Sequence, residues 1–208
     1  MIRVSFWKKV FVSIAMGVLA LVPLDASESL FIKMHIEDPV QWHPWSSEVH
    51  DEFRSSGKPG LIVISHELNE LSAAMAKESF RNEEIAEQIN ENFFPILIDK
   101  NEHLQLAELF AIYVWNAKQV GGWPLTVFVT PELKPIDGGG YYPPTDSWGS
   151  QGLSSVVSSV GEQWEDNREV LLIKADESLE ELESYYGVES DPSISFEPGL
   201  LDLAVENL

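Results

Sequence analysis

Three short apolar runs, separated by stretches with helical spacing, constrain the fold of this chain most strongly. The runs are Leu61–Ile64, Phe94–Ile98 and Leu125–Thr130. Short apolar runs rich in β-branched residues are typical of strands that are buried on both faces. Strands that alternate with helices are joined by crossover connections, and these connections produce a parallel sheet covered by helices.

The segments between the runs carry recognisable helix boundaries. Ser46 or Ser47 can cap a helix that ends at Gly57, and Asn82 can cap a helix over 83–92. Within a further helix over 68–80, the inward positions are predicted to be Leu71, Met75 and Phe80. Additional helices are expected over 104–114, 153–167 and 168–186.

A turn after Thr130 leads into a fourth short strand, Pro135–Gly140, which predicts an antiparallel edge on an otherwise parallel sheet. The sequence therefore predicts an α/β protein, built as a three-layer α/β/α sandwich around a central mixed sheet.

The N-terminus has the order of a secretory signal. Arg3, Lys8 and Lys9 form a basic region, an apolar run follows over 10–22, and Ala26 offers a small residue for cleavage. We therefore expect residues 1–26 to be a signal peptide and the protein to be exported, either to a periplasm or to the medium. An uncleaved anchor is the alternative, although the run is shorter than the roughly 20 residues of a spanning helix.

Composition excludes several classes of function. The formal net charge is −21, which repels phosphate backbones and anionic lipid, so we expect no nucleic-acid partner. The chain has no cysteine, and this excludes thiol catalysis, disulfide exchange and thiolate metal sites. No other segment is apolar enough to span a membrane once the signal is removed.

Several motifs, in the correct order, resemble one known family. Asp38–Trp45 is similar to an opening Asn-Pro-Val-Asp-Trp-Tyr-Pro-Trp, and Glu78–Phe80 to a Glu-Ser-Phe helix junction. Gly121–Phe128 is the most specific match, and Gly140–Pro144 is similar to Gly-Thr-Tyr-Phe-Pro-Pro. The stretch 38–186 thus resembles the thioredoxin-like domain of the spermatogenesis-associated protein 20-like family. The resemblance implies a thioredoxin-like fold over 27–187.

The sequence differs from this family at the positions of its redox-active cysteines. Members carry Cys-x-x-Cys-His after the first core strand, and a gapless count places Asn69, Ser72 and Ala73 at these positions. Neither an amide nor an unactivated hydroxyl can replace a thiolate. In the segment that follows the second strand, Asp99 and Glu102 match the family, while its arginines and proline are absent.

In the thioredoxin-like fold, a cis-proline lies beside the altered helix, and the resemblance places it at Pro124. The backbone around Trp123 is then able to pair with an extended peptide, as in strand addition. The alternative is that this proline only preserves the fold. We assign no catalytic residue, metal or cofactor, and we predict a protein or peptide ligand in a groove formed by His66, Glu67, Asn69, Ser72, Trp123 and Pro124.

Two other interpretations remain open. One is a hydrolase or metal-dependent enzyme that uses His66, Glu67 and Glu70, because His66 and Glu70 are four residues apart. No third ligand is evident, and Ser72 as a nucleophile would need a histidine base. The other is a remnant or fragment of a larger protein, in which 188–208 is a linker and helical stub that resembles the start of the family's helical domain.

The remaining histidines and aromatic residues carry weaker signals. His35, His43 and His50 show no ligand spacing and are expected at the surface. Trp42 and Trp45 could line a cleft, but aromatic side chains more often pack in a core.

Overall fold

The structure is a computed structural model that describes residues 27–147 and 149–185. The predicted signal peptide over 1–26 and the predicted linker and stub over 188–208 lie outside this range. Within the described ranges, no helix combines the length and the apolar character needed to cross a membrane.

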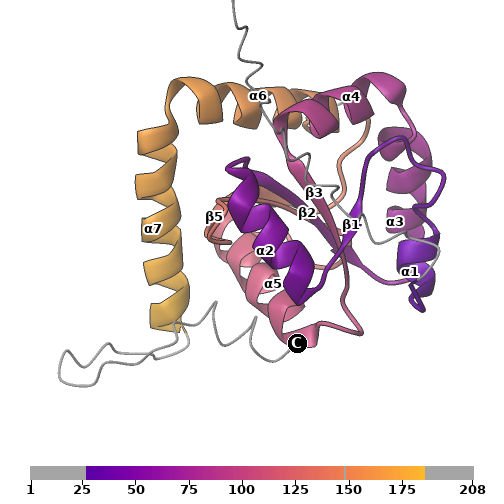
Figure 1. Cartoon of the computed structure of the whole chain (residues 1–208), viewed down its shortest axis with the longest axis horizontal. Coiled ribbons are helices and arrows are strands. Elements are labelled where there is room, and N and C mark those ends of the chain that lie inside the picture. The colour runs from indigo at the N-terminus through magenta and orange to yellow at the C-terminus, as the bar shows by residue number, and fades with distance from the viewer. Residues whose placement is uncertain (1–26, 148, 186–208) are drawn as a thin grey trace, which may run out of the picture.

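A five-stranded mixed sheet forms the centre of the fold (Figure 1). Its order is β1-β3-β2-β4-β5, with β3 parallel to both β1 and β2, and β4 antiparallel to both β2 and β5. This confirms the predicted parallel core with an antiparallel edge. The strands are β1 (His43–Pro44), β2 (Gly60–Ser65), β3 (Phe94–Asp99), β4 (Leu125–Val129) and β5 (Pro135–Gly139).

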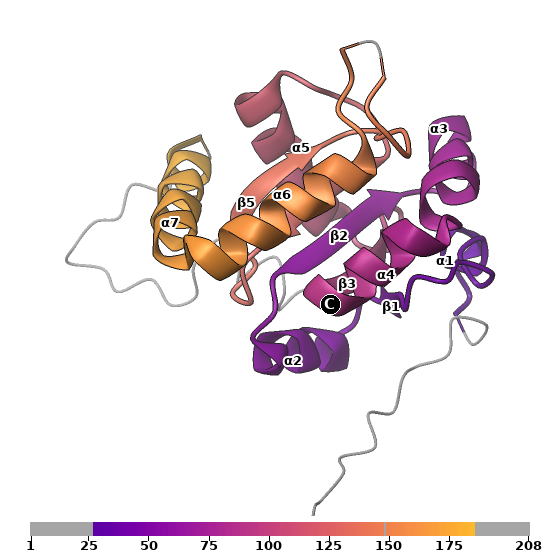
Figure 2. The ribbon, with the colours of Figure 1, turned by 90° about the horizontal axis from the view of Figure 1, so that it is seen from above.

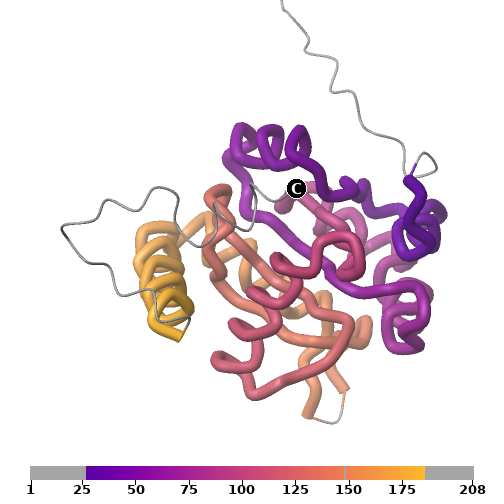
Figure 3. The backbone as a smooth tube through the Cα atoms, turned by 90° about the horizontal axis from the view of Figure 1, so that it is seen from below, coloured from indigo at the N-terminus to yellow at the C-terminus, as the bar shows by residue number. Residues whose placement is uncertain are grey.

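Helices cover both faces of the sheet, and the buried side chains form two clusters. One face is covered by α1 (Leu30–Lys33), α3 (Glu70–Met75), η2 (Ala76–Phe80), α4 (Glu83–Asn92) and α6 (Leu153–Asp166). The other is covered by α2 (Ser47–Ser56) and α5 (Leu104–Lys118), together with α7 (Arg168–Tyr185). Figure 2 shows α4 and α6 over the sheet, and Figure 3 shows the opposite face. The predicted three-layer sandwich is therefore confirmed.

Alternation along the strands divides the core between the two layers. In β2, Leu61 and Val63 belong to the cluster beneath α4 and α6, while Ile62 and Ile64 belong to the cluster beneath α5. Successive side chains of a strand point to opposite faces, so a central strand with helices on both sides must be apolar at every position. This requirement explains the continuous apolar run in the sequence.

The helix caps lie where the sequence predicts them. The Ser46 hydroxyl accepts from the backbone N–H of Val49 at 3.2 Å, and α2 ends at Gly57, whose φ is +67°. The Asn82 side chain accepts from the backbone N–H groups of Glu84 and Ile85 at 3.0 and 3.1 Å. Each cap satisfies N–H groups that the first helical turn leaves without a partner.

The segment 68–80 differs from the single helix that was predicted. It consists of α3 followed by η2, a π-helical turn, and the predicted inward position of Leu71 is wrong, because this side chain is 51% exposed. Met75 and Phe80 are buried as predicted, and their spacing brings Ser72 and Ser79 to the same inner face. A search for apolar inward residues misses these serines.

Two histidines expected at the surface are buried, so this prediction is also wrong. His43 in β1 has its Nδ1 atom 3.0 Å from the carbonyl oxygen of Pro95, and its ring stacks on Phe94. Burial lowers the pKa of His43, which favours the neutral ring. His35 is also buried, and its Nδ1 atom lies 2.6 Å from Asp38 Oδ2. Both buried rings therefore have a polar partner, the Pro95 carbonyl for His43 and the Asp38 carboxylate for His35.

Asp38 connects the first family-like motif to the helix junction at Arg81. Its side chain is fully buried and its Oδ2 atom accepts from His35 Nδ1 at 2.6 Å and from Trp42 Nε1 at 3.1 Å. Arg81 Nε lies 3.5 Å from Oδ1, while Arg81 also contacts the exposed Glu37. Asp38 therefore binds two donors through Oδ2 and forms an ion pair with Arg81 through Oδ1.

Replacing Asp38 by Ala should destabilise the protein by about 3 kcal/mol, because it leaves the buried donors of His35 and Trp42 without their acceptor. The matched control is Glu37→Ala, which removes only the exposed partner of Arg81 and should cost less than about 1 kcal/mol. Urea unfolding followed by circular dichroism measures both values. Equal losses in the two variants would contradict a central role for Asp38.

Candidate functional site

The candidate site lies at one edge of the sheet, where the carboxyl ends of β2 and β3 meet the start of β4. Ser65 pairs with Asp99 at the ends of the parallel strands, and Ile64 pairs with Leu125 at the start of β4. The connections that leave or enter the sheet at this edge therefore converge, and parallel α/β sheets commonly bind ligands at this edge.

Asn69 joins two of these connections. Its Oδ1 atom accepts from the backbone N–H of Ser72 at 2.8 Å and so caps α3. Its Nδ2 atom donates to the carbonyl oxygen of Trp123 at 3.1 Å. Asn69 thus uses one side of its amide to start the helix and the other to hold the segment before β4.

Ser72 is 3% exposed and lies within a small neutral network. Its hydroxyl is 2.5 Å from the hydroxyl of Ser65, which is fully buried at the end of β2, and 3.1 Å from Asn69 Oδ1. Neither partner is a base, so this arrangement does not activate Ser72 as a nucleophile. The three side chains satisfy one another's hydrogen bonds.

The peptide bond between Trp123 and Pro124 is cis, as the resemblance implied. Gly122 precedes it with a φ of +91°, a conformation that favours glycine and turns the chain into the site. Trp123 is half-buried, and Lys100 Nζ lies 5.4 Å from the centre of its ring. Lys100 follows β3, so all three connections contact one another here.

His66, Glu67 and Glu70 lie at the rim of this site, with the backbone N–H of Asn69 donating to the His66 carbonyl at 3.2 Å. Side chains of His66 and Glu67 are half-buried, and Glu70 is exposed. Within the described residues, no group of three or more histidine, cysteine or acidic side chains is arranged to hold a metal ion. Among these residues, the fold therefore provides no set of ligands for the metal-dependent interpretation.

Exposed apolar side chains lie next to Asn69, and the sequence pattern did not predict them. Leu68 is 81% exposed and Leu71 is 51% exposed, on either side of Asn69 in the chain. Val120 is also exposed, and both Val120 and the carbonyl oxygen of Pro124 lie close to Gly140. The spacing of Leu71 relative to Met75 suggested a core position, and only the packed helix reveals its exposure.

Comparison with known proteins identifies similar sequences over most of the chain. Residues 22–183 match the family model Thioredox_DsbH, described as "Protein of unknown function, DUF255". Rat spermatogenesis-associated protein 20 is 33% identical over 145 residues, which are 70% of this chain and 18% of that protein. The human protein of that name gives the same identity and coverage.

Two other matches extend this comparison. The uncharacterized protein B0495.5 of Caenorhabditis elegans is 32% identical over 148 residues, 71% of this chain and 20% of that protein. The chain therefore spans about a fifth of the length of the curated relatives it matches. A solved structure named DsbH Oxidoreductase is 18% identical, with a TM-score of 0.44, over 62% of this chain and 86% of that chain.

If Asn69 and Ser72 occupy paired positions, replacing both with cysteine should create an intramolecular disulfide. Ser72 Oγ lies 3.1 Å from Asn69 Oδ1 at the start of α3, so the two side chains face one another with the spacing of a Cys-x-x-Cys pair at a helix N-terminus. Mild oxidation should therefore remove two hydrogens from the intact mass of N69C/S72C and block its alkylation. The control, N69C/L71C, should remain alkylatable because Leu71 points to solvent. Equal oxidation of both variants would contradict this geometry.

Proposed function

Because this chain belongs to the family described as "Protein of unknown function, DUF255", we propose that it is an exported, non-redox member whose thioredoxin-like scaffold binds an extended segment of a partner protein. The hydrogen bond between Asn69 and the Trp123 carbonyl carries this proposal. It joins the position where the family resemblance predicts a cysteine to the segment before the cis-proline.

The backbone before β4 is suited to pairing with a peptide. The β2–β4 ladder ends at the pair Ile64 and Leu125, so Trp123 lies beyond the hydrogen bonds of the sheet. Its carbonyl oxygen accepts one bond from Asn69 and retains a second lone pair. An extended segment can add to such a backbone through main-chain hydrogen bonds.

The side chains around this backbone favour an apolar partner. Leu68 and Leu71 are exposed on either side of Asn69 in the chain. The Ser65 and Ser72 hydroxyls are buried, so Asn69 is the member of the neutral network that borders these leucines. Exposed apolar side chains in a cluster, rather than singly, are typical of interaction surfaces. The acidic character of the whole chain favours basic residues elsewhere in the bound segment.

The proposed binding does not involve redox chemistry, because the composition excludes a reactive thiol. The sequence has no cysteine, so no thiolate is available to attack a disulfide. The scaffold contacts of Asp38 and the caps of α2 and α4 do not involve the site. We therefore assign this site to partner binding rather than to disulfide exchange.

We expect the double variant L68S/L71S to bind a synthetic peptide of alternating leucine and lysine about tenfold more weakly than the original protein. Two leucines that become buried on binding are worth at least this factor. Fluorescence anisotropy of the labelled peptide measures the affinity, and a peptide of alternating leucine and glutamate should bind poorly because of the acidic surface.

The matched control is V170S/I173S, which removes two exposed apolar side chains from α7. This variant also replaces two exposed apolar side chains by serine but lies outside the candidate site, and its peptide affinity should remain unchanged. The same affinity in both double variants, with circular dichroism showing that both are folded, would contradict a groove at residues 68–72.

Export is a separate part of the proposal and rests on the basic-then-apolar order of the N-terminus. After expression of the full chain in a bacterium with a periplasm, the periplasmic fraction should contain a protein whose intact mass lacks residues 1–26. The variant I14D/L19D interrupts the apolar run and should retain the full mass in the cytoplasm. Full-length wild-type protein in the cytoplasmic fraction would contradict export.

A further inference from the structure

A pocket of about 530 Å³ lies where the end of α1 and the chain that follows it meet α3 and η2. Figure 1 and Figure 2 show α1 and α3 at the same side of the molecule. Lys33, Lys77 and Arg81 line this pocket, which we call the basic pocket. None of the residues of the proposed peptide groove lines it, so a ligand can bind here whether or not a peptide binds in the groove.

Positive charge is concentrated in the basic pocket of a strongly acidic protein. The chain has 13 lysine and arginine residues against 34 aspartate and glutamate residues. Three basic residues nevertheless line this pocket, together with a single acidic residue, Glu37. At physiological ionic strength, exposed charges more than about 8 Å apart are largely screened, so the nearby cations rather than the net charge determine which ions the pocket attracts.

Among the described residues, two of these cations have no acidic partner. Neither Lys33 nor Lys77 forms an ion pair there, whereas Arg81 contacts both Glu37 and Asp38. Lys77 and Arg81 are also four residues apart, and like charges at this spacing along a helix repel each other. An anion in the pocket would reduce this repulsion and would supply the partner that the lysines lack.

Arg81 is held at the wall of the pocket and retains donors for a ligand. Its Nε atom lies 3.5 Å from Oδ1 of the fully buried Asp38 side chain, which fixes the guanidinium. Its Nη2 atom lies 3.3 Å from Oε2 of Glu37, whose side chain is 79% exposed, and an ion pair with so exposed a partner is weak. Because a guanidinium carries five donors, Arg81 can bind a ligand oxygen as well.

The rest of the lining is apolar. Met34 and Ile36 follow α1, and Ala73 and Ala76 contribute small side chains from α3 and η2. Ile36 is 47% exposed and Met34 is half-buried, so both present apolar surface that a ligand can cover. A flexible methionine adapts to the shape of an apolar group and contacts aromatic rings favourably.

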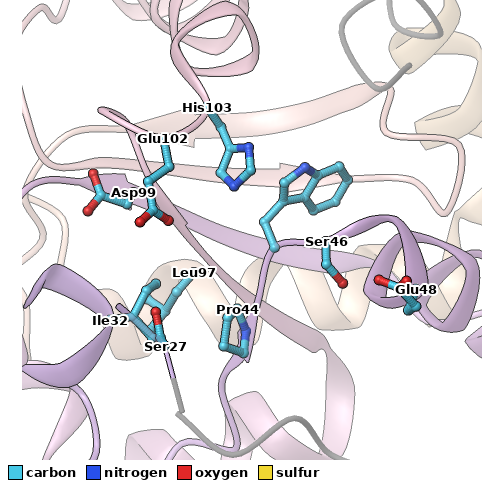
Figure 4. Close-up of a pocket in the computed structure, with 10 residues that line it drawn as sticks. Ser27, Ile32, Pro44, Ser46, Glu48, Leu97, Asp99, Glu102 and His103 are labelled. Atoms are coloured by element: carbon cyan, nitrogen blue, oxygen red, sulfur yellow. The ribbon is translucent and has the colours of Figure 1, made fainter. Parts of the chain in front are cut away.

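An acidic cavity at the ends of β1 and β3 provides a comparison. Figure 4 shows Glu48, Asp99 and Glu102 among its labelled side chains, and no lysine or arginine of the described chain lines it. An anion is repelled by those carboxylates and attracted by the cations of the basic pocket. The two cavities therefore differ in the sign of the ligand that they favour.

We propose that the basic pocket binds a small organic phosphate monoester. The phosphate group contacts Lys33, Lys77 and Arg81, and the organic group lies against Met34 and Ile36. A phosphate monoester carries up to two negative charges near pH 7, which match the two lysines without acidic partners among the described residues. The volume is within the range of small-molecule sites, and the apolar lining favours an ester over inorganic phosphate.

The test follows the backbone amide signals of Ala73 and Ala76 in the ¹⁵N-labelled full chain, with phenyl phosphate as the probe. We expect both signals to shift, with a dissociation constant on the order of 1 mM at physiological ionic strength. Inorganic phosphate lacks the ring and should bind about tenfold more weakly. Benzenesulfonate has the ring but only one negative charge, and it should bind about threefold more weakly.

A pair of lysine variants locates the phosphate group. Lys77→Gln removes a cation that forms no ion pair within the described chain, and it should weaken phenyl phosphate binding about threefold. Lys174→Gln removes the same charge from an exposed position of α7 outside the pocket and should leave the affinity unchanged.

Three results would each overturn the proposal. One is that phenyl phosphate shifts neither amide signal. Another is that inorganic phosphate or benzenesulfonate binds as tightly as phenyl phosphate. The third is that the two lysine variants bind phenyl phosphate with equal affinity, because attraction would then come from overall charge rather than from this pocket.

Discussion

The parallel register of β2 and β3 is the constraint on which the rest of this structure depends. Because Ser65 pairs with Asp99, both strands end at the same edge of the sheet, and β4 begins there through the pair of Ile64 and Leu125. The connections after β2, after β3 and before β4 are consequently brought together. A shift of one residue would turn every side chain of a strand to the opposite layer, and two buried faces prevent such a shift.

The motifs that resemble the family serve the scaffold more than the candidate site. Asp38 contacts Arg81, the Ser79 hydroxyl donates to the carbonyl oxygen of Tyr142 at 3.0 Å, and the Tyr141 hydroxyl is 3.1 Å from Glu78. Three separated motifs thus pack against one another. The altered positions form their own neutral hydrogen bonds, so the fold is maintained here without cysteine.

The sequence by itself determined the alternation of strands and helices, the caps at Ser46 and Asn82, and the absence of thiol chemistry, because these depend on residue type and short-range spacing. It also placed Asn69, Ser72 and Pro124 together through the family resemblance. Tertiary structure alone decided that Leu71 is exposed while Ser72 is buried. It also decided that His43 meets a carbonyl 52 residues away and that Ser29 meets Asp99 across 70 residues. Burial of a polar side chain depends on partners that are distant in the chain, and local spacing contains no information about them.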